Sequence, residues 1–438
     1  METDLNKALR RLSNLEAAWR VISANGRTSK SDEVKLELEK FAQDASRNLR
    51  SIQTRLVKKT FAFGLAKGVP VPKLDEHGNR TGKSRPIVLA PVESRVVQRA
   101  TLNVLLTVEK LQPFVKTPFS FGGIRSERRR DETSREARSK ALSAVPAAID
   151  CVLKQIGAGG KYVASADIRS FFTQISKSHV ESIVANAVED PIFMAFFKSS
   201  IKVELFNLAE LRANAADFPI EDIGVAQGNS LSPLLGNIVL SDFDRLMNEG
   251  DCRCIRYIDD FIIIAPTEKA ANARLRRSIE ILRGLGMELS PEKSSKGGMP
   301  VEAGFDFLGI SIKPGIIRPA QKAQAKFLTS LDAVFLEGVK SMRGVANGAT
   351  FDRTRSLLGT MRRVDGMIDG WGKHYWFCND QPSMAAIDGK IATRIGKFLG
   401  EYRDIRELAD PKLKTSILGI SELAKQPREP FVYPKKTA

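Results

Sequence analysis

The chain has 438 residues, enough for two domains with separate hydrophobic cores, and its 42% hydrophobic and 27% charged residues are typical of a folded protein. Lysine and arginine outnumber aspartate and glutamate by 68 to 51, so the net charge is +17 and a polyanionic partner is expected, with nucleic acid favoured over membrane lipid. The sequence has no apolar signal segment and no apolar run long enough to span a membrane, which predicts a cytoplasmic protein with no membrane contact. The spacing of its four cysteines and three histidines shows neither a disulfide framework nor a zinc site.

The first 140 residues contain helical and hairpin signals. Apolar residues recur at helical spacing from Leu5 to Leu56 with an interruption at Asn25-Gly26, which predicts two amphipathic helices joined by a turn. Short apolar runs then flank a polar, glycine-containing tip between residues 69 and 90, the pattern of a β-hairpin. A helix is expected from Ser94 to Glu109. Six arginines follow within residues 125–138, and they suit either a phosphate backbone or an exposed helix face; the candidates for nucleic-acid binding are Arg125, Arg128, Arg129 and Arg130.

The middle of the chain contains two strands that carry carboxylates. One strand ends at Asp167, and a second strand and hairpin surround Tyr257-Ile258-Asp259-Asp260. A further strand is expected over residues 305–312, after which Pro314-Gly315 and Pro319 precede a helical, basic C-terminal part. We therefore expect two domains, 1–320 and 321–438.

The paired acids Asp259 and Asp260 interrupt an otherwise apolar strand pair. Burying two adjacent carboxylates is costly, so the arrangement indicates divalent cations that neutralise them, although an ordinary Asp-Asp turn is the competing interpretation. Asp167 supplies a third strand-terminal acid. Three such carboxylates complete the ligand set of a two-metal site, which catalyses in-line displacement at a phosphate.

These motifs resemble those of reverse transcriptases, in particular the bacterial branch that contains group II intron proteins. The matching segments occur in the order of that family: residues 18–32 and 49–56, VPKLDEHGNRTGKSRPIVLAPVESRVVQRA, PFSFGGIRSERR, DIRSFF, AQGNSLSPLLGNIVL, YIDD, ELSPEKS and FDFLGISI, with a weaker match at DGWGKHYW. The resemblance implies an α+β fold of the right-hand polymerase type, with fingers, an antiparallel-sheet palm and a helical thumb. The chain departs from intron and retron enzymes at Ile258, where they usually carry alanine.

The resemblance also assigns a role to each matching residue. Asp167, Asp259 and Asp260 become the catalytic metal ligands, assisted by the backbone carbonyl of Ile168, and two Mg²⁺ ions are implied, with Mn²⁺ as the alternative metal. The implied nucleotide-binding residues are Lys73, Arg85, Phe172, Gln227, Gly228 and Lys293.

Each of these nucleotide-binding assignments has a structural alternative. Arg85 and Lys73 would grip the triphosphate, or they are solvated hairpin charges. Phe172 would exclude a ribose 2′-hydroxyl, or it is a core aromatic residue, which is the interpretation we prefer for Phe171. Gln227-Gly228 would let the backbone approach the nascent base pair, or form a plain turn. Lys293 would protonate the departing pyrophosphate, or it is a surface lysine.

The partners implied by the resemblance are an RNA template, deoxynucleoside triphosphates and a DNA product. The sequence lacks a recognisable endonuclease segment, so it resembles stand-alone enzymes, which in bacteria often copy a companion structured non-coding RNA in antiphage defence. Alternatives are a group II intron-type maturase with reverse transcriptase activity, template-independent DNA synthesis, an RNA-dependent RNA polymerase and a non-catalytic RNA-binding protein. Phe172 argues against the RNA polymerase, and the intact acid triad argues against the non-catalytic protein. The sequence does not specify an oligomeric state.

Overall fold

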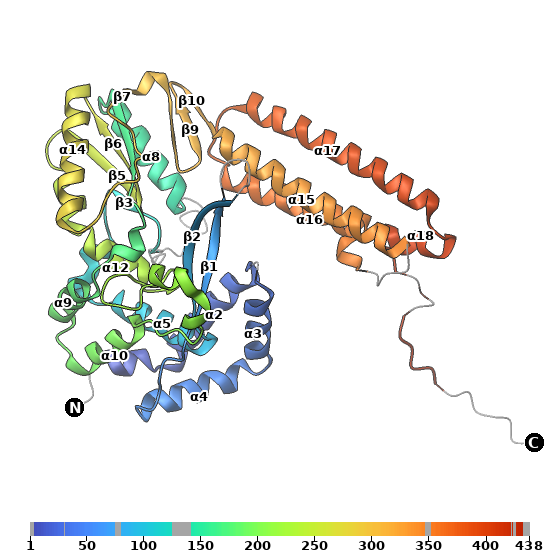
Figure 1. The fold of residues 1–438 in the computed structure, drawn as a ribbon, viewed down its shortest axis with the longest axis horizontal. Helices are drawn as coiled ribbons and strands as arrows, with labels where there is room; N and C mark the ends of the chain where they lie inside the picture. Colours follow the sequence, from blue (N-terminus) through green and yellow to red (C-terminus); the bar gives the residue numbers. More distant parts are fainter. Residues whose placement is uncertain are drawn as a thin grey trace, which may run out of the picture. The chain divides into compact units, whose positions relative to one another are not determined.

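A computed structural model describes residues 4–29, 31–74, 80–124, 142–346, 352–421, 423 and 426–431. The chain forms two compact units, Met1–Ala303 and Gly304–Ala438. Both contain helices together with largely antiparallel sheets, so the α+β prediction is confirmed (Figure 1). No helix in the described ranges has the length and apolar character that crossing a membrane requires.

The first unit begins with four helices, α1 (Asp4–Leu9), α2 (Leu12–Arg27), α3 (Asp32–Gln43) and α4 (Ala45–Val57). The prediction of two helices was wrong in number: a break does follow Asn25-Gly26, since α2 ends at Arg27, but the chain also breaks between α1 and α2 and between α3 and α4. The new helices begin at caps, where the side chains of Ser31 and Asp44 accept hydrogen bonds from the backbone of α3 and α4. Gly26 serves a packing role, since a Cβ there would lie 1.8 Å from a methyl group of Leu38.

The predicted hairpin is confirmed as β1 (Lys67–Leu74) paired antiparallel with β2 (Arg80–Leu89). Val71 lies opposite Arg85, and the register shifts between Pro72 and Leu74. Lys73 sits at this irregularity, which is a position where a bulge can redirect a side chain. Helix α5 (Val92–Leu105) follows and is buried along most of its length.

A five-stranded sheet lies at the centre of the first unit, in the order β3-β5-β6-β4-β7. Its strands are β3 (Ser120–Phe121), β4 (Tyr162–Asp167), β5 (Arg253–Tyr257), β6 (Asp260–Ala265) and β7 (Met299–Pro300). All pairs are antiparallel except β3 with β5. Helices α8 (Ala144–Gly157) and α14 (Glu268–Gly284) pack against the sheet, which explains why β6 is a nearly continuous apolar run (Figure 1).

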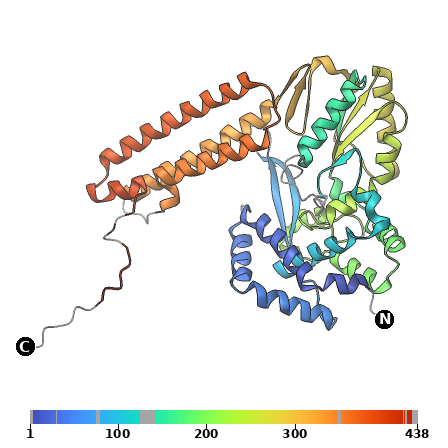
Figure 2. The ribbon, with the colours of Figure 1, turned by 180° about the vertical axis from the view of Figure 1, so that it is seen from behind.

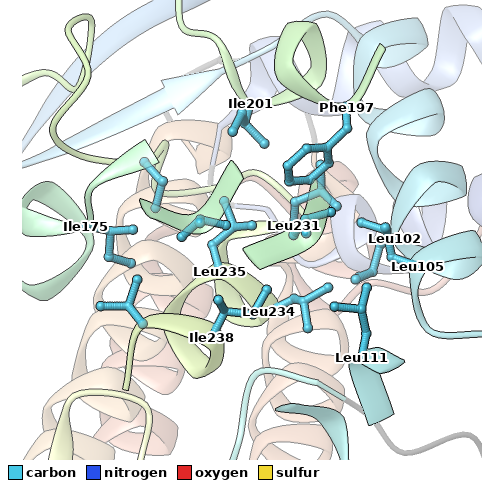
Figure 3. Packing of buried hydrophobic residues seen from close by; sticks show 14 of the residues in the cluster. Leu102, Leu105, Leu111, Ile175, Phe197, Ile201, Leu231, Leu234, Leu235 and Ile238 are labelled. Atoms are coloured by element: carbon cyan, nitrogen blue, oxygen red, sulfur yellow. The ribbon is translucent and has the colours of Figure 1, made fainter. Parts of the chain in front are cut away.

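The main core of this unit joins helices that are distant in sequence. Figure 3 shows Leu102 and Leu105 of α5 beside Phe197 and Ile201, with Leu231, Leu234, Leu235 and Ile238 close by. The contributing helices are α9 (Lys177–Val188), α10 (Pro191–Ile201), α12 (Ser232–Val239) and α13 (Ser241–Met247), and the shorter α6 (Gln112–Val115) and α11 (Leu208–Leu211) complete the unit. This packing fixes the loop that precedes α12, which carries Gln227 and Gly228.

The second unit consists of a small antiparallel sheet and helices. Its strands are β8 (Phe305–Phe307), β9 (Ile310–Lys313) and β10 (Ile316–Pro319), and its helices are α15 (Gln321–Ala346), α16 (Leu357–His374), α17 (Gln381–Leu408) and α18 (Lys414–Leu418). Both views show α15, α16 and α17 lying side by side (Figures 1 and 2). Trp371 stacks on Phe327 at 4.8 Å between ring centroids and contacts Tyr375, so these aromatic residues are structural within this unit.

The division between the units falls after Ala303, ahead of the position near residue 320 that the sequence suggested. Side-chain contacts explain why β9 and β10 group with the helices. Asn379 accepts a hydrogen bond from the backbone of Ile317 and donates one to Gly315, while Arg318 forms an ion pair with Asp380 at 3.3 Å. The short sheet is thereby attached to the start of α17.

Arg256 of β5 is a charged side chain with 0% exposure. Its guanidinium donates to both carboxylate oxygens of Asp244 at 2.7 and 2.5 Å, to the Asn237 side chain at 3.2 Å and to the carbonyl of Ile258 at 2.8 Å. The bond to Ile258 connects this network to the residue that precedes the paired acids. A buried bidentate pair of this kind fixes geometry, because every alternative arrangement leaves a buried charge unpaired.

Replacing Arg256 by Met should destabilise the fold by about 3 to 5 kcal/mol, because Asp244 keeps its charge without its partner. The matched control is Arg245→Met, on the neighbouring α13, whose ion pairs with Asp242 and Glu249 are solvent-exposed; its cost should stay below about 1 kcal/mol. Urea unfolding of the two variants measures this difference. Equal stability of the two variants would show that the Arg256 network does not support the sheet.

Candidate active site

Asp167 and Asp260 lie directly opposite each other in the central sheet. Asp167 is the last residue of β4 and Asp260 is the first residue of β6, and the antiparallel register pairs them. Residues paired in this way have side chains on the same face with their Cβ atoms about 5 Å apart. The strand that ends in one acid and the hairpin that carries the other two therefore meet at the same end of the paired strands β4 and β6.

Asp259 is held in the tight turn between β5 and β6. The turn places Ile258 at φ +62°, a strained conformation for a β-branched residue. Two hydrogen bonds stabilise it: the Ile258 carbonyl accepts from Arg256, and the Asp259 carbonyl accepts from the backbone NH of Ile168 at 3.0 Å. The second bond connects the turn to the residue that follows Asp167, so the three acids are fixed relative to one another.

Burial and the neighbouring carboxylates disfavour the charged forms of Asp259 and Asp260. Desolvation, followed by the charge of Asp167, raises the pKa of Asp259. Desolvation, the hydrogen bond with Asp167 and the charge of Asp259 raise the pKa of Asp260 to about 7. A cluster of carboxylates whose negative charge is this unfavourable has a high affinity for positive charge.

The segment after α14 supplies hydrogen-bond donors to Asp167. The hydroxyl of Ser290 donates to one carboxylate oxygen of Asp167 and the ammonium group of Lys293 to the other, both at 2.8 Å. The backbone NH of Ser290 also donates to the Asp167 carbonyl. Although burial lowers the pKa of Lys293, the hydrogen bond and charge of Asp167 outweigh it, and the net pKa shift is upward. Sequence analysis missed Ser290, since no spacing rule relates it to Asp167.

Basic side chains of the hairpin gather beside the acids. The pKa of Lys73 is lowered, first by burial and then by the positive charges of Arg85 and Lys293, while Asp167 opposes the shift. An exposed ion pair at 3.6 Å also links Lys83 of β2 to Glu292 in the segment that carries Lys293. The structure thus brings Lys73, Arg85 and Lys293 together next to the carboxylates.

Phe171 and Phe172 have different environments. Phe171 is buried, and its ring would be 2.8 Å from a Cβ added to Gly236 of α12, so its predicted core position is confirmed. Phe172 is half-buried, and its carbonyl accepts a hydrogen bond from Val225 at 2.8 Å. This bond places Phe172 close to the loop that contains Gln227.

Gln227 and Gly228 lie against strand β2. The Gln227 carbonyl accepts a hydrogen bond from Val88 at 3.1 Å. Gly228 has φ +115°, and a Cβ there would lie 3.1 Å from the Val88 carbonyl. Glycine is required at this position by both the backbone conformation and the close approach of β2.

Of the remaining candidate residues, the structure describes Ile168. Ile168 is buried, and its backbone faces Leu289 in an isolated bridge. Arg125, Arg128, Arg129 and Arg130 fall outside the described residues.

The donor set of the site fits divalent metal ions. In the described part of the chain no group of three or more His, Cys, Asp or Glu side chains already encloses a metal position, and Lys293 occupies one oxygen of Asp167. Mg²⁺ does not need such a cage, because it uses one or two carboxylates and completes its coordination with water and substrate phosphates. The raised pKa values of Asp259 and Asp260 mean that their negative charges are unfavourable without a counter-charge, which a bound cation can supply.

Comparison with known proteins gives the family. Residues 71–312 match the family model described as "Reverse transcriptase (RNA-dependent DNA polymerase)". Protein YkfC of Escherichia coli (strain K12) is 26% identical, with 56% of this chain and 65% of YkfC covered.

Two solved structures are also similar. A chain of a partial Cas6-RT-Cas1–Cas2 complex has 17% identity and a TM-score of 0.34, with 64% of this chain and 42% of that chain covered. Apo telomerase from Candida tropicalis, truncated from its C-terminal domain, has 14% identity and a TM-score of 0.35, with 61% and 58% covered. The chain spans less than two thirds of the length of YkfC and of both structures. The family model covers more than half of the chain, and the chain therefore belongs to the reverse transcriptase (RNA-dependent DNA polymerase) family.

Proposed function

We propose that this protein is an RNA-directed DNA polymerase in which Asp167, Asp259 and Asp260 hold two Mg²⁺ ions, with Mn²⁺ as a substitute. The observation that carries the proposal is the direct pairing of Asp167 with Asp260 across β4 and β6, with Asp259 fixed in the adjoining turn. Family membership supports the use of divalent cations. We assign the first unit to fingers and palm, and the helices of the second unit to the thumb.

Each group at the site has a role in nucleotide transfer. The metal ions, when bound, supply Lewis-acid stabilisation to the attacking and leaving oxygens. The carboxylates hold the cations and orient them, with the Ile168 carbonyl as a further ligand. Arg85 and Lys73 bind the triphosphate, whose negative charge relieves the repulsion between these cations. Lys293 keeps its proton while it is bonded to Asp167, and it can donate that proton to the leaving group once the contact breaks.

Phe172 selects the sugar of the incoming nucleotide in this proposal. It is half-buried, and its backbone is bonded to the loop of Gln227 and Gly228, which we assign to the nascent base pair. A ring fixed in this way excludes a 2′-hydroxyl by steric contact and leaves deoxyribose unaffected.

The template is proposed to be a structured non-coding RNA, copied into DNA in antiphage defence. The net charge of +17 supports an RNA partner, and the resemblance to stand-alone enzymes supports the biological setting. A maturase-type role in RNA splicing and template-independent DNA synthesis are the alternatives. Sequencing the RNA that copurifies with the protein, together with the DNA made from it, distinguishes the three.

Simultaneous replacement of Asp259 and Asp260 by Ala should lower nucleotide incorporation by at least about a thousandfold, since several kcal/mol of transition-state stabilisation depend on the bound metals. The measurement is primer extension on an RNA template with Mg²⁺. RNA affinity should be retained, and the exposed Asp242→Ala variant on α13 should extend primers normally. Near-normal incorporation by the double variant would disprove the metal assignment.

Phe172→Val should raise the use of ribonucleotides relative to deoxyribonucleotides by about tenfold, which corresponds to about 1.4 kcal/mol of differential barrier. Single-nucleotide extension with matched ribo- and deoxyribonucleotides measures the ratio of kcat/KM values. Phe172→Tyr, which keeps the ring, is the control and should retain the wild-type ratio. An unchanged ratio in the Val variant would remove the sugar-selection role and favour the RNA polymerase alternative.

Asp260→Asn should stabilise the metal-free protein at alkaline pH. The folded-state pKa of Asp260 is raised from 3.8 to about 7, so the folded protein binds this proton more tightly than the unfolded chain and loses stability as the pH rises between these values. Since one pKa unit corresponds to about 1.4 kcal/mol, Asn should add at least about 1 kcal/mol at about pH 8.5 in EDTA and nothing near pH 3. Chemical unfolding across pH tests this, with Asp242→Asn as the exposed control. A variant less stable than wild type at the alkaline end would contradict the pKa argument.

A further inference from the structure

Helix α10 has two apolar faces, and the fold buries only one of them. Phe193, Met194, Phe197 and Ile201 are buried, and Figure 3 shows Phe197 and Ile201 within the core. A second set recurs at the i, i+3, i+4, i+7 spacing of another helix face and lines a cavity of about 510 Å³: Ile192, Ala195, Phe196 and Ser199. The side chain of Ile192 is 50% exposed, so this face is available to a ligand.

The opposite walls of the cavity come from α1 and from the end of α4. Leu9 ends α1 and Arg10 follows it, while Lys59 follows α4 at φ +58°. Asn6 of α1 donates a hydrogen bond to Asp190, the residue that caps α10, which connects two of the walls. Among the described residues that line the cavity, the charged side chains are Arg10 and Lys59, and none is acidic. Asp190 is acidic and adjoins the same wall through its bond to Asn6, so the exposed Lys59 is the lining cation that we assign to a negatively charged ligand.

Aromatic rings form the apolar part of the cavity. Phe61 and Phe196 line it, and both contact Phe63, with centroid distances of 5.3 and 5.4 Å. The guanidinium of Arg55 lies 5.3 Å from the centroid of the Phe61 ring. Aromatic side chains beside cations are the combination that binds unpaired nucleotides, because the base stacks on a ring while the phosphate meets a positive charge. The volume also falls within the usual range for small-ligand sites, about 300 to 1,000 Å³.

We propose that this cavity binds one unpaired nucleotide of the RNA partner, with its base against Phe61 and Phe196 and its phosphate toward Lys59. The inference rests on the proposed function in that it takes RNA as the partner. The lining shares no residue with the candidate active site, so the cavity anchors the RNA without taking part in nucleotide transfer. It would give the enzyme a means of selecting an RNA that presents an unpaired base at this point.

The test uses the full chain and a single-stranded RNA of about 20 nucleotides that contains 4-thiouridine, a length that exceeds the site size of common single-strand binding folds. Ala195→Trp fills the cavity from α10, and Ala195→Ser leaves it open. Lys59→Gln removes a lining charge, whereas Lys58→Gln removes its exposed neighbour, which does not line the cavity. Filling the cavity should weaken RNA affinity about tenfold, which is the effect expected for one lost base stack. Cross-links mapped by mass spectrometry should fall on Phe61 or on residues 192–199 and disappear in Ala195→Trp.

Two results would overturn the proposal. One is wild-type affinity and cross-linking in both Ala195→Trp and Lys59→Gln. The other is that free uridine monophosphate binds in the cavity while Ala195→Trp leaves RNA affinity unchanged, which would identify a mononucleotide site. Primer extension at saturating primed template separates this question from the proposed function, because Ala195→Trp should keep full activity there. If the wild-type protein does not extend primers and Ala195→Trp still weakens RNA affinity, the polymerase assignment is refuted and the cavity proposal stands.

Discussion

The repulsion between three carboxylates at the paired ends of β4 and β6 is the constraint on which the rest of the site depends. Asp167 and Asp260 face each other across paired strands, and Asp259 lies in the turn beside them. Burial raises the pKa of Asp259 and Asp260, so the metal-free fold maintains an arrangement that electrostatics opposes. The surrounding structure supplies the compensation: apolar strands on both sides, the buried Arg256 network under the turn, and Ser290 and Lys293 on the carboxylate of Asp167.

Positive charge is arranged around the same point from two directions. The hairpin β1–β2 brings Lys73 and Arg85, and the segment after α14 brings Lys293. Backbone bonds from Val88 to the loop of Gln227 hold the hairpin against the rest of the unit. The cations repel one another and so do the carboxylates, and pairs such as Lys293 with Asp167 offset this repulsion in part. We propose that a metal-bound polyphosphate offsets the rest. This complementarity is the physical basis for assigning nucleotide transfer to this site.

Local sequence patterns predicted the hairpin β1–β2 and the strand pair β5–β6. The hairpin of residues 67–89 and the strand pair around Asp259 and Asp260 follow from alternating apolar runs and turn residues. Long-range packing was not predictable in this way. Gly26 near the end of α2 leaves room for Leu38 of α3, and Arg256 is buried where Asp244 of α13 pairs with it.

The most direct test of the metal assignment is a count of bound Mn²⁺ by electron paramagnetic resonance, in a complex with an RNA template, a DNA primer and a non-hydrolysable deoxynucleotide. The carboxylate cluster predicts two ions per chain that the Asp259→Ala, Asp260→Ala protein no longer binds. Two ions retained by that variant, or fewer than two in the wild-type complex, would contradict the assignment of these acids as the ligands of a two-metal site.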